Sequence, residues 1–128
     1  MRLLLDTHTL LWWLNESASL PASARRLISD KGNEVLVSAA SAWEIATKVR
    51  LGRLPSAVEL AQDFIGHMER EGFEELPISV DHAIRAGLLP GFHKDPFDRM
   101  LVAQSQAENV SIVSNDEKFD AYNVRRLW

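Results

Sequence analysis

The chain has 128 residues, no cysteine and a formal charge of −4 at pH 7. This length fits one domain, residues 1–128, with a real hydrophobic core, and is too short for two. The lack of cysteine excludes disulfides and thiolate metal sites and fits a cytoplasmic protein. No apolar run approaches the roughly 20 residues that cross a bilayer. Asp6 and His8 interrupt the apolar N-terminal stretch, so we expect neither a signal peptide nor contact with a membrane.

Strands and helices alternate along the chain. The run at residues 3–5 is short, apolar and ended by Asp6, which is typical of a buried parallel strand. Turn residues and helix-starting residues set the other boundaries. The predicted elements are, in chain order, strand 3–5, helices 9–14 and 22–29, strand 35–37, helices 42–50 and 57–70, strand 73–76, helices 81–87 and 96–108, and strands 111–113 and 124–127. This order predicts an α/β fold with a parallel sheet of about five strands, flanked by helices on both faces.

Four carboxylates are expected at one edge of this sheet. In a parallel sheet every strand ends, and every following helix begins, at the edge where open α/β proteins bind their ligands. Asp6 closes the first strand, and Glu44 lies in the first turn of the helix after the second strand. Asp98 lies in the first turn of helix 96–108, and Asp116 follows strand 111–113. The four side chains should therefore converge.

Each of these acids also has a purely structural interpretation. Ser41 and Glu44 have the spacing of a capping box, and Asp95, directly before Pro96, is typical of a helix N-cap. Acidic residues near helix N-termini are in any case favoured by the helix dipole. Capping alone, however, does not explain four carboxylates at one edge, because crowded carboxylates repel unless a cation compensates them.

A hard divalent cation is the expected compensating charge. Mg²⁺ and Mn²⁺ prefer carboxylate oxygens and water. The absence of cysteine and of a paired-histidine motif makes a zinc site unexpected. Such an acid-only metal site suits phosphoryl chemistry.

Four segments carry a resemblance that covers the chain from end to end. They are LLLDTH, SAASAWEIATKVRLGRL, DPFDRMLVAQS and VSNDEKF. In this order they resemble the PIN domain, and specifically the VapC-type toxin ribonucleases of bacterial and archaeal toxin–antitoxin pairs. The family's acids map onto Asp6, Glu44, Asp98 and Asp116, which the resemblance makes the catalytic residues and metal ligands. Thr7, Ser114 and Asn115 map onto supporting positions.

The resemblance implies a PIN-like fold and an endoribonuclease that depends on Mg²⁺ or Mn²⁺. Its products would carry 5′-phosphate and 3′-hydroxyl ends, and its action would inhibit translation. The implied partners are an RNA substrate, a VapB-type antitoxin that silences the enzyme, and a second copy of the chain in a homodimer. Glu44 would either bind the metal or orient the attacking water, and the sequence does not separate these roles.

Basic residues would have to receive the phosphates of such a substrate. A net charge of −4 argues against binding nucleic acid by charge alone, but basic residues cluster locally. Contact with RNA and an ordinary solvated surface are equally good interpretations of them. The candidates are Lys48, Arg50, Arg53, Lys94 and Arg99.

Two other functions compete with this hypothesis. A receiver-type signalling domain is also a small α/β protein with edge aspartates, but it needs paired acids after the first strand, where Asp6 is followed by Thr7. A PIN-like module could bind RNA without cutting it, although all four acids are present here.

Aromatic residues and histidines receive no catalytic role. Trp43 is expected in the core, and of the neighbours Trp12 and Trp13 one is expected in the core and the other at an interface. The histidines lack metal-ligand spacing, and only His8 is kept as a polar group near the site. They are His8, His67, His82 and His93.

Overall fold

Five parallel strands form the centre of the molecule. The computed structural model describes residues 1–91 and 94–128. The strands are β1 (Arg2–Leu5), β2 (Glu34–Ser38), β3 (Glu74–Leu76), β4 (Ser111–Val113) and β5 (Arg126–Leu127). Their spatial order is β3-β2-β1-β4-β5, and each neighbouring pair is parallel. The predicted fold class is therefore confirmed.

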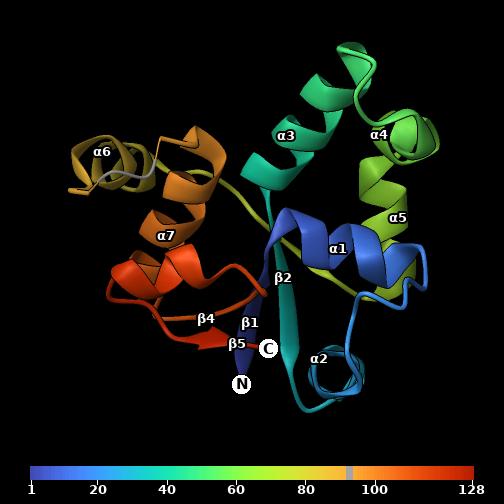
Figure 1. The fold of residues 1–128 in the computed structure, drawn as a ribbon, viewed down its shortest axis with the longest axis horizontal. Coiled ribbons are helices and arrows are strands. Elements are labelled where there is room, and N and C mark those ends of the chain that lie inside the picture. The colour runs from blue at the N-terminus through green and yellow to red at the C-terminus, as the bar shows by residue number, and fades with distance from the viewer. Residues whose placement is uncertain (92–93) are drawn as a thin grey trace.

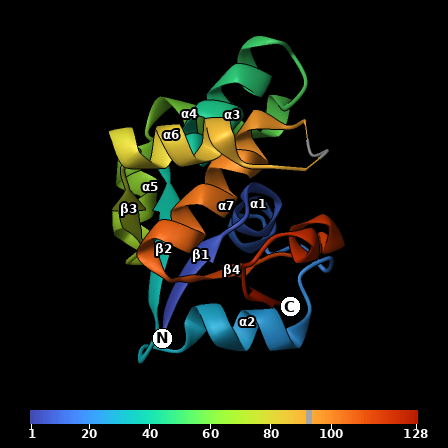
Figure 2. The ribbon, with the colours of Figure 1, turned by 90° about the vertical axis from the view of Figure 1, so that its left-hand side faces the viewer.

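Helices cover both faces of the sheet. They are α1 (Thr7–Leu14), α2 (Ala22–Ser29), α3 (Ala39–Arg50), α4 (Val58–Gln62), α5 (Phe64–Glu71), α6 (Val80–Leu88) and α7 (Pro96–Glu108), with 3₁₀ turns η1 (Pro55–Ala57) and η2 (Glu117–Ala121). Helices α6 and α7 lie on one side of β1 and β2, and α1, α2 and α5 lie on the other (Figure 1). The turned view places the N-terminus near α2, at the end of the sheet away from α3 (Figure 2). The carboxyl ends of the strands thus point toward α3.

Strict alternation along β1 divides the core into two clusters. Leu3 and Leu5 pack with α1, α2 and α5 on one face, whereas Leu4 packs with α7 and η2 on the other. All three leucines are fully buried, as expected for a central strand covered on both faces. Among the described residues, no helix combines the length and the apolar character needed to cross a bilayer.

The two largest errors in the predicted boundaries come from polar caps. The predicted helix 57–70 is broken at Asp63, whose backbone leaves the helical region and whose carboxylate accepts from Gly66 N at 3.2 Å to start α5. Helix α3 begins at Ala39, because Ser38 Oγ accepts from Ala40 N at 2.9 Å. The capping box of Ser41 and Glu44 is therefore not formed, and Glu44 lies in the second turn.

Helix α7 begins as the sequence predicts. Asp95 is its N-cap, and the Oδ1 atom accepts from Phe97 N at 2.8 Å and from Asp98 N at 3.2 Å. Pro96 occupies the first helical position, where its missing N–H costs nothing. One aspartate therefore satisfies the start of the helix, and the Asp98 side chain is not needed as the cap.

We predict that a substitution of Asp95 lowers stability only when the new side chain cannot accept hydrogen bonds from the backbone N–H groups at the start of α7. Asp95→Ala should lower the free energy of unfolding by about 1 kcal/mol, because the N–H groups of Phe97 and Asp98 lose their acceptor. Asp95→Asn should remain within a few tenths of a kcal/mol of the original chain, because asparagine caps nearly as well. Urea unfolding of the three proteins measures this, and equal losses for both variants would contradict the capping role.

Candidate active site

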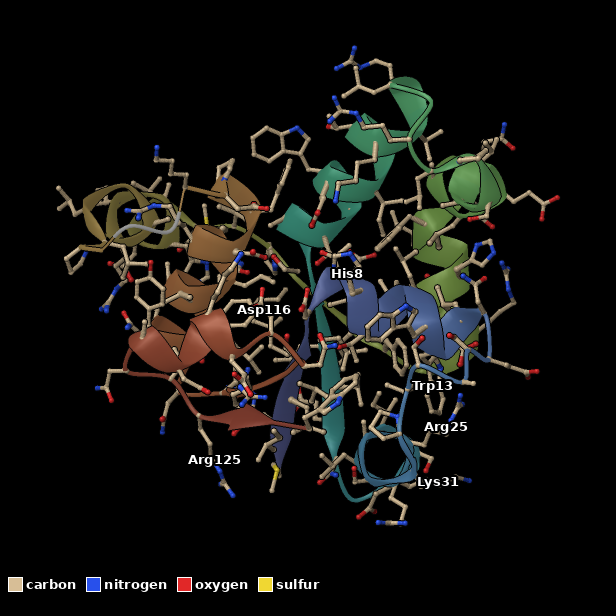
Figure 3. All side chains as sticks on the ribbon, viewed as in Figure 1. His8, Trp13, Arg25, Lys31, Asp116 and Arg125 are labelled. Carbon is tan, nitrogen blue, oxygen red and sulfur yellow. The ribbon has the colours of Figure 1, made fainter. Side chains whose placement is uncertain are left out.

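The four predicted acids come from four different elements. Asp6 follows β1 and Glu44 lies in α3, and each is only 4% exposed. Asp98 lies in the first turn of α7, and Asp116 is the N-cap of η2; both are half-buried. The parallel sheet thus brings acids separated by up to 110 residues of sequence to one edge, which Figure 3 marks with Asp116 and with His8 of α1.

A buried serine fixes the geometry of two of these acids. Ser114 Oγ donates to Asp6 Oδ2 at 2.6 Å and accepts from Asp116 N at 3.0 Å. A hydroxyl-to-carboxylate bond of this length is a strong, charge-assisted one. The second Asp6 oxygen accepts from His8 N at 3.4 Å and so caps α1. Asp6 and Asp116 are therefore both capping residues and members of the acidic cluster.

Glu44 has its own positive partner. Lys48 Nζ lies 2.5 Å from Glu44 Oε2, one helical turn further along α3. Glu44 is almost completely buried, so this contact supplies the compensating charge that a buried carboxylate requires. Next to it, Thr7 Oγ1 donates to Ser41 Oγ at 2.9 Å and ties the start of α1 to α3.

The acids repel one another strongly. Burial raises the pKa of Asp98 to about 8, and the nearby charges of Asp95, Asp6, Glu44 and Asp116 push it in the same direction. Burial also raises the pKa of Asp6, against the lowering effect of the Ser114 hydrogen bond. In the absence of a cation, the Asp98 carboxyl therefore holds a proton at neutral pH.

This donor set fits a hard divalent cation. It offers carboxylate oxygens at one edge, and a cation would favour the charged form of Asp98, whose pKa is raised by burial and by the nearby carboxylates. Within residues 1–91 and 94–128, no three acidic or histidine side chains form a preassembled metal cage. Glu44 is engaged by Lys48 instead, so closure around an ion requires the carboxylates to turn toward it.

A groove of about 1160 Å³ opens from the acidic edge. Asp98 and Asp116 line one part of it, together with His8. Its other walls carry the cations Lys94 and Lys118 and the half-buried ring of Tyr122. The acids thus lie in an open channel with both positive and aromatic lining, which suits an extended, negatively charged ligand.

The predicted basic residues have different surroundings. Lys48 faces Glu44, and Lys94 lines the groove. Arg99 donates to the backbone carbonyls of Ala86 and Leu89 and ties α7 to the end of α6. Arg50 ends α3, Arg53 lies in the turn after it, and both are exposed. Their contact with RNA stays a prediction.

Asn115, His82 and His93 are further residues named from the sequence. Asn115 is exposed and has no described contact with the acids. His82 is buried and pairs with Glu108 at 2.8 Å, which agrees with a structural role, whereas His93 lies outside the described residues.

Sequence reasoning missed a contact between two aromatic rings beside the acids, one exposed and one half-buried. Trp43 was expected in the core, but 59% of its surface is exposed. Its ring packs edge-on against Phe97, with ring centroids 4.9 Å apart. Each ring directly precedes a site acid, Glu44 or Asp98, and successive helix residues point in directions about 100° apart, so the residue before a site acid can lie at the surface. That neighbour relation is the signal that could have found it.

Comparison with known proteins settles the family. A sequence model of the PIN domain matches residues 3–124. The chain belongs to the PIN domain family. This PIN domain also resembles Ribonuclease VapC16 from Mycobacterium tuberculosis, with 48% identity over 59 residues. That match covers 46% of the chain and 40% of the length of the relative.

Solved structures share the PIN fold across almost the whole chain. VapBC2 from Rickettsia felis, bound to a DNA fragment from its promoter, has a TM-score of 0.71 at 19% identity and covers 99% of this chain and 98% of its own. A toxin–antitoxin complex from Klebsiella pneumoniae has a TM-score of 0.67 at 19% identity, and the match covers 98% of this chain and 95% of that one. At this level of identity the similarity concerns the fold.

We predict a specific pH dependence of stability in metal-free buffer. The pKa of Asp98 is about 8 in the folded chain, against an ordinary value of 3.8. The folded chain therefore keeps a proton that the unfolded chain releases, so stability should fall as pH rises between about 4 and 8. Asp98→Asn removes this titrating group, so its stability should decrease less over the same pH range.

Thermal melts in EDTA at about pH 5 and about pH 8.5 provide the measurement. Between these two pH values the melting temperature of the original chain should decrease more than that of Asp98→Asn. The difference between the two decreases should be about 3 °C or more. Glu59→Gln, at an exposed position of α4, is the control for a general loss of negative charge. Parallel pH profiles for the original chain and Asp98→Asn would show that Asp98 does not carry the effect.

Proposed function

We propose that this PIN domain is a divalent-metal-dependent endoribonuclease that acts as the toxin of a toxin–antitoxin pair. The reaction is hydrolysis of an RNA phosphodiester bond to 5′-phosphate and 3′-hydroxyl ends, and its consequence is inhibition of translation. The observation that carries the proposal is the convergence of Asp6, Glu44, Asp98 and Asp116, with the pKa of Asp98 raised to about 8. Strongly perturbed carboxylates in an open groove mark a functional site.

The chain's own residues prepare this edge for phosphoryl chemistry. Asp6, Asp98 and Asp116 would hold Mg²⁺ or Mn²⁺, and Glu44 would either join them or orient the attacking water. The bound ion would supply a more acidic water and a positive charge beside the scissile phosphate. Ser114 keeps Asp6 and Asp116 in fixed relation through bonds of 2.6 and 3.0 Å. Lys48 offsets the charge of Glu44, so fewer uncompensated carboxylates face the substrate.

The substrate class follows from the shape and lining of the groove. Its volume of about 1160 Å³ exceeds that of a site for one small molecule. Lys94 and Lys118 beside the acids could pair with phosphates, and Tyr122 offers a ring for a base. Single-stranded RNA satisfies all three features.

We predict that cleavage depends on Asp6 and on a divalent ion. Asp6→Asn should lose activity by orders of magnitude, because it removes the charge that a cation needs while keeping the size of the side chain. Ser114→Ala should lose about 10- to 100-fold, the usual effect of removing a group that orients a metal ligand. Cleavage of labelled total RNA, with the ends mapped, measures both, and Glu59→Gln should cut normally.

The ion itself distinguishes this mechanism from metal-free RNA cleavage. Mg²⁺ and Mn²⁺ should support activity and Ca²⁺ should do so poorly, because its looser coordination misplaces the attacking water. Full activity in EDTA would overturn the metal assignment. Binding of RNA without cutting, in Mg²⁺ and in Mn²⁺, would favour the non-cleaving alternative, whereas membership of the PIN family already excludes the receiver-type hypothesis.

The proposal includes a partner that silences the enzyme. Related structures bear the names VapBC and toxin–antitoxin complex, and by analogy we propose a VapB-type chain for this protein. An arginine or lysine of that chain could pair with Asp98 and Asp116, since Lys48 already compensates Glu44 within the chain. Cytoplasmic location and a homodimer belong to the same proposal.

We predict that partner affinity depends on the acids. Asp98→Asn and Asp116→Asn should each weaken binding of the co-expressed VapB-type chain about tenfold or more. Each variant removes one carboxylate from the pair with the basic side chain of the partner. Glu59→Gln should bind as the original chain does. Isothermal titration measures the affinities, and unchanged binding in both site variants, or a complex with full RNase activity, would contradict inhibition at the acidic edge.

A further inference from the structure

A second pocket lies at the opposite end of α7. Its volume is about 620 Å³, and its charged side chains are three arginines from three separate elements: Arg2 of β1, Arg85 of α6 and Arg125, which precedes β5. Three side-chain amides also line it, from Gln106, Asn109 and Asn123. In the described part of the chain no carboxylate lines this pocket, although the protein as a whole has a charge of −4.

The pocket continues the groove that starts at the acids. Gln106 and Asn123 line both hollows. Along α7, Asp98 lies at the acidic end, Gln106 about two turns further and Asn109 at the C-cap, so these residues share one face of the helix. At 1.5 Å per residue, Asp98 and Asn109 are about 16 Å apart along the helix axis. Figure 3 labels Asp116 of the acidic edge and Arg125 of this pocket.

Two of the arginines are available to a ligand, and the third has a structural role. Arg2 donates to the carbonyl of Glu108 at 3.3 Å and so offsets the negative end of α7. Arg85 pairs through Nε with Asp81 at 2.9 Å, in an exposed ion pair of small energy. Arg125 is exposed, and no ion pair to it occurs among the described residues. The terminal nitrogens of Arg85 and the whole guanidinium of Arg125 therefore give the pocket a positive charge.

We propose that this arginine pocket binds backbone phosphates of the RNA strand on one flank of the cleaved bond. The inference rests on the proposed ribonuclease function and adds a second contact to it. A guanidinium matches a phosphate with two parallel hydrogen bonds, and side-chain amides can complete the shell. A stacked strand advances about 3.4 Å per nucleotide, so about five nucleotides span the 16 Å between acids and arginines.

Continuity with the acidic edge favours RNA over an acidic peptide. The acids at one end of the groove repel any polyanion, so a strand that must reach them needs an attachment elsewhere along its path. The arginine pocket provides that attachment without adding a cation to the acidic cluster. An acidic peptide bound by the arginines would gain nothing from a groove that leads toward four carboxylates.

The test compares RNA lengths in a variant that lacks both available arginines. Fluorescence anisotropy, in the Asp6→Asn background to prevent cleavage, measures binding of labelled single-stranded RNA of about three and about ten nucleotides. Arg85→Gln with Arg125→Gln should weaken the long RNA about tenfold and lower its salt slope by about 1.4, the value for two phosphates. The short RNA should bind within about twofold of the Asp6→Asn protein.

A matched double variant controls for the general loss of positive charge. Arg26→Gln with Arg70→Gln removes two arginines that are exposed on α2 and α5, and it should leave both RNAs unaffected. Circular dichroism and thermal melts establish that all variants fold. With Asp6 restored, the pocket variant should still cleave the short RNA at its normal rate and lose activity only on the long one.

The outcomes separate this inference from the proposed function. Unchanged affinity for the long RNA, or equal losses for both lengths, overturns the pocket assignment while leaving ribonuclease activity intact. If the pocket variant binds RNA normally but loses the partner chain, the pocket is a protein site and the inference is wrong. A wild-type chain that cuts no RNA, but whose long-RNA binding still depends on the two arginines, would refute the ribonuclease and keep the pocket.

Discussion

The mutual repulsion of carboxylates at one edge of the sheet is the constraint on which the site depends. Burial is the larger cause, and burial and this repulsion together raise the pKa of Asp98 to about 8, although Ser114 stabilises Asp6 and Lys48 stabilises Glu44. Each of these compensating contacts is made by a residue on the same edge or one turn along the same helix. These contacts lower the repulsion enough to hold the acids together, and a bound cation would lower it further.

A buried network of polar side chains joins α3, α7 and α6 next to this edge. Ser38, the N-cap of α3, donates to Gln104 Oε1 of α7 at 2.5 Å, and Gln104 Nε2 reaches His82 Nδ1 of α6 at 3.4 Å. Ser79 N also points at His82 Nδ1, so this atom accepts, and Nε2 donates to Glu108. Among the described residues every buried polar side-chain atom has a partner. A fully satisfied network favours a single arrangement of its helices, which fixes the distance between Glu44 on α3 and Asp98 on α7.

The sequence predicted the strands and the acids because each depends on local signals. A short apolar run ended by an aspartate defines β1, and the parallel order then places every such end at one edge. Two local features were missed because another signal in the sequence competed with them. The break at Asp63 reflects a competing cap, and Trp43 is exposed although large aromatic residues are usually buried. The arginine pocket joins residues 2, 85 and 125, which no spacing in the sequence brings together, so only the fold could reveal it.

The net charge of −4 conceals a strong separation of charge along α7. Acids gather where the helix begins, and arginines gather where it ends. This arrangement places the binding of a polyanionic strand and the reaction at different ends of the helix. The arginines attract the strand about 16 Å from the acids, which is longer than the Debye length of about 8 Å, so solvent ions screen the two groups of charges from each other. Lys94 and Lys118, closer to the acids, are flexible point charges that can follow a moving phosphate. A strand held firmly at the far end and loosely at the near end can position its scissile bond without neutralising the carboxylates that the reaction requires.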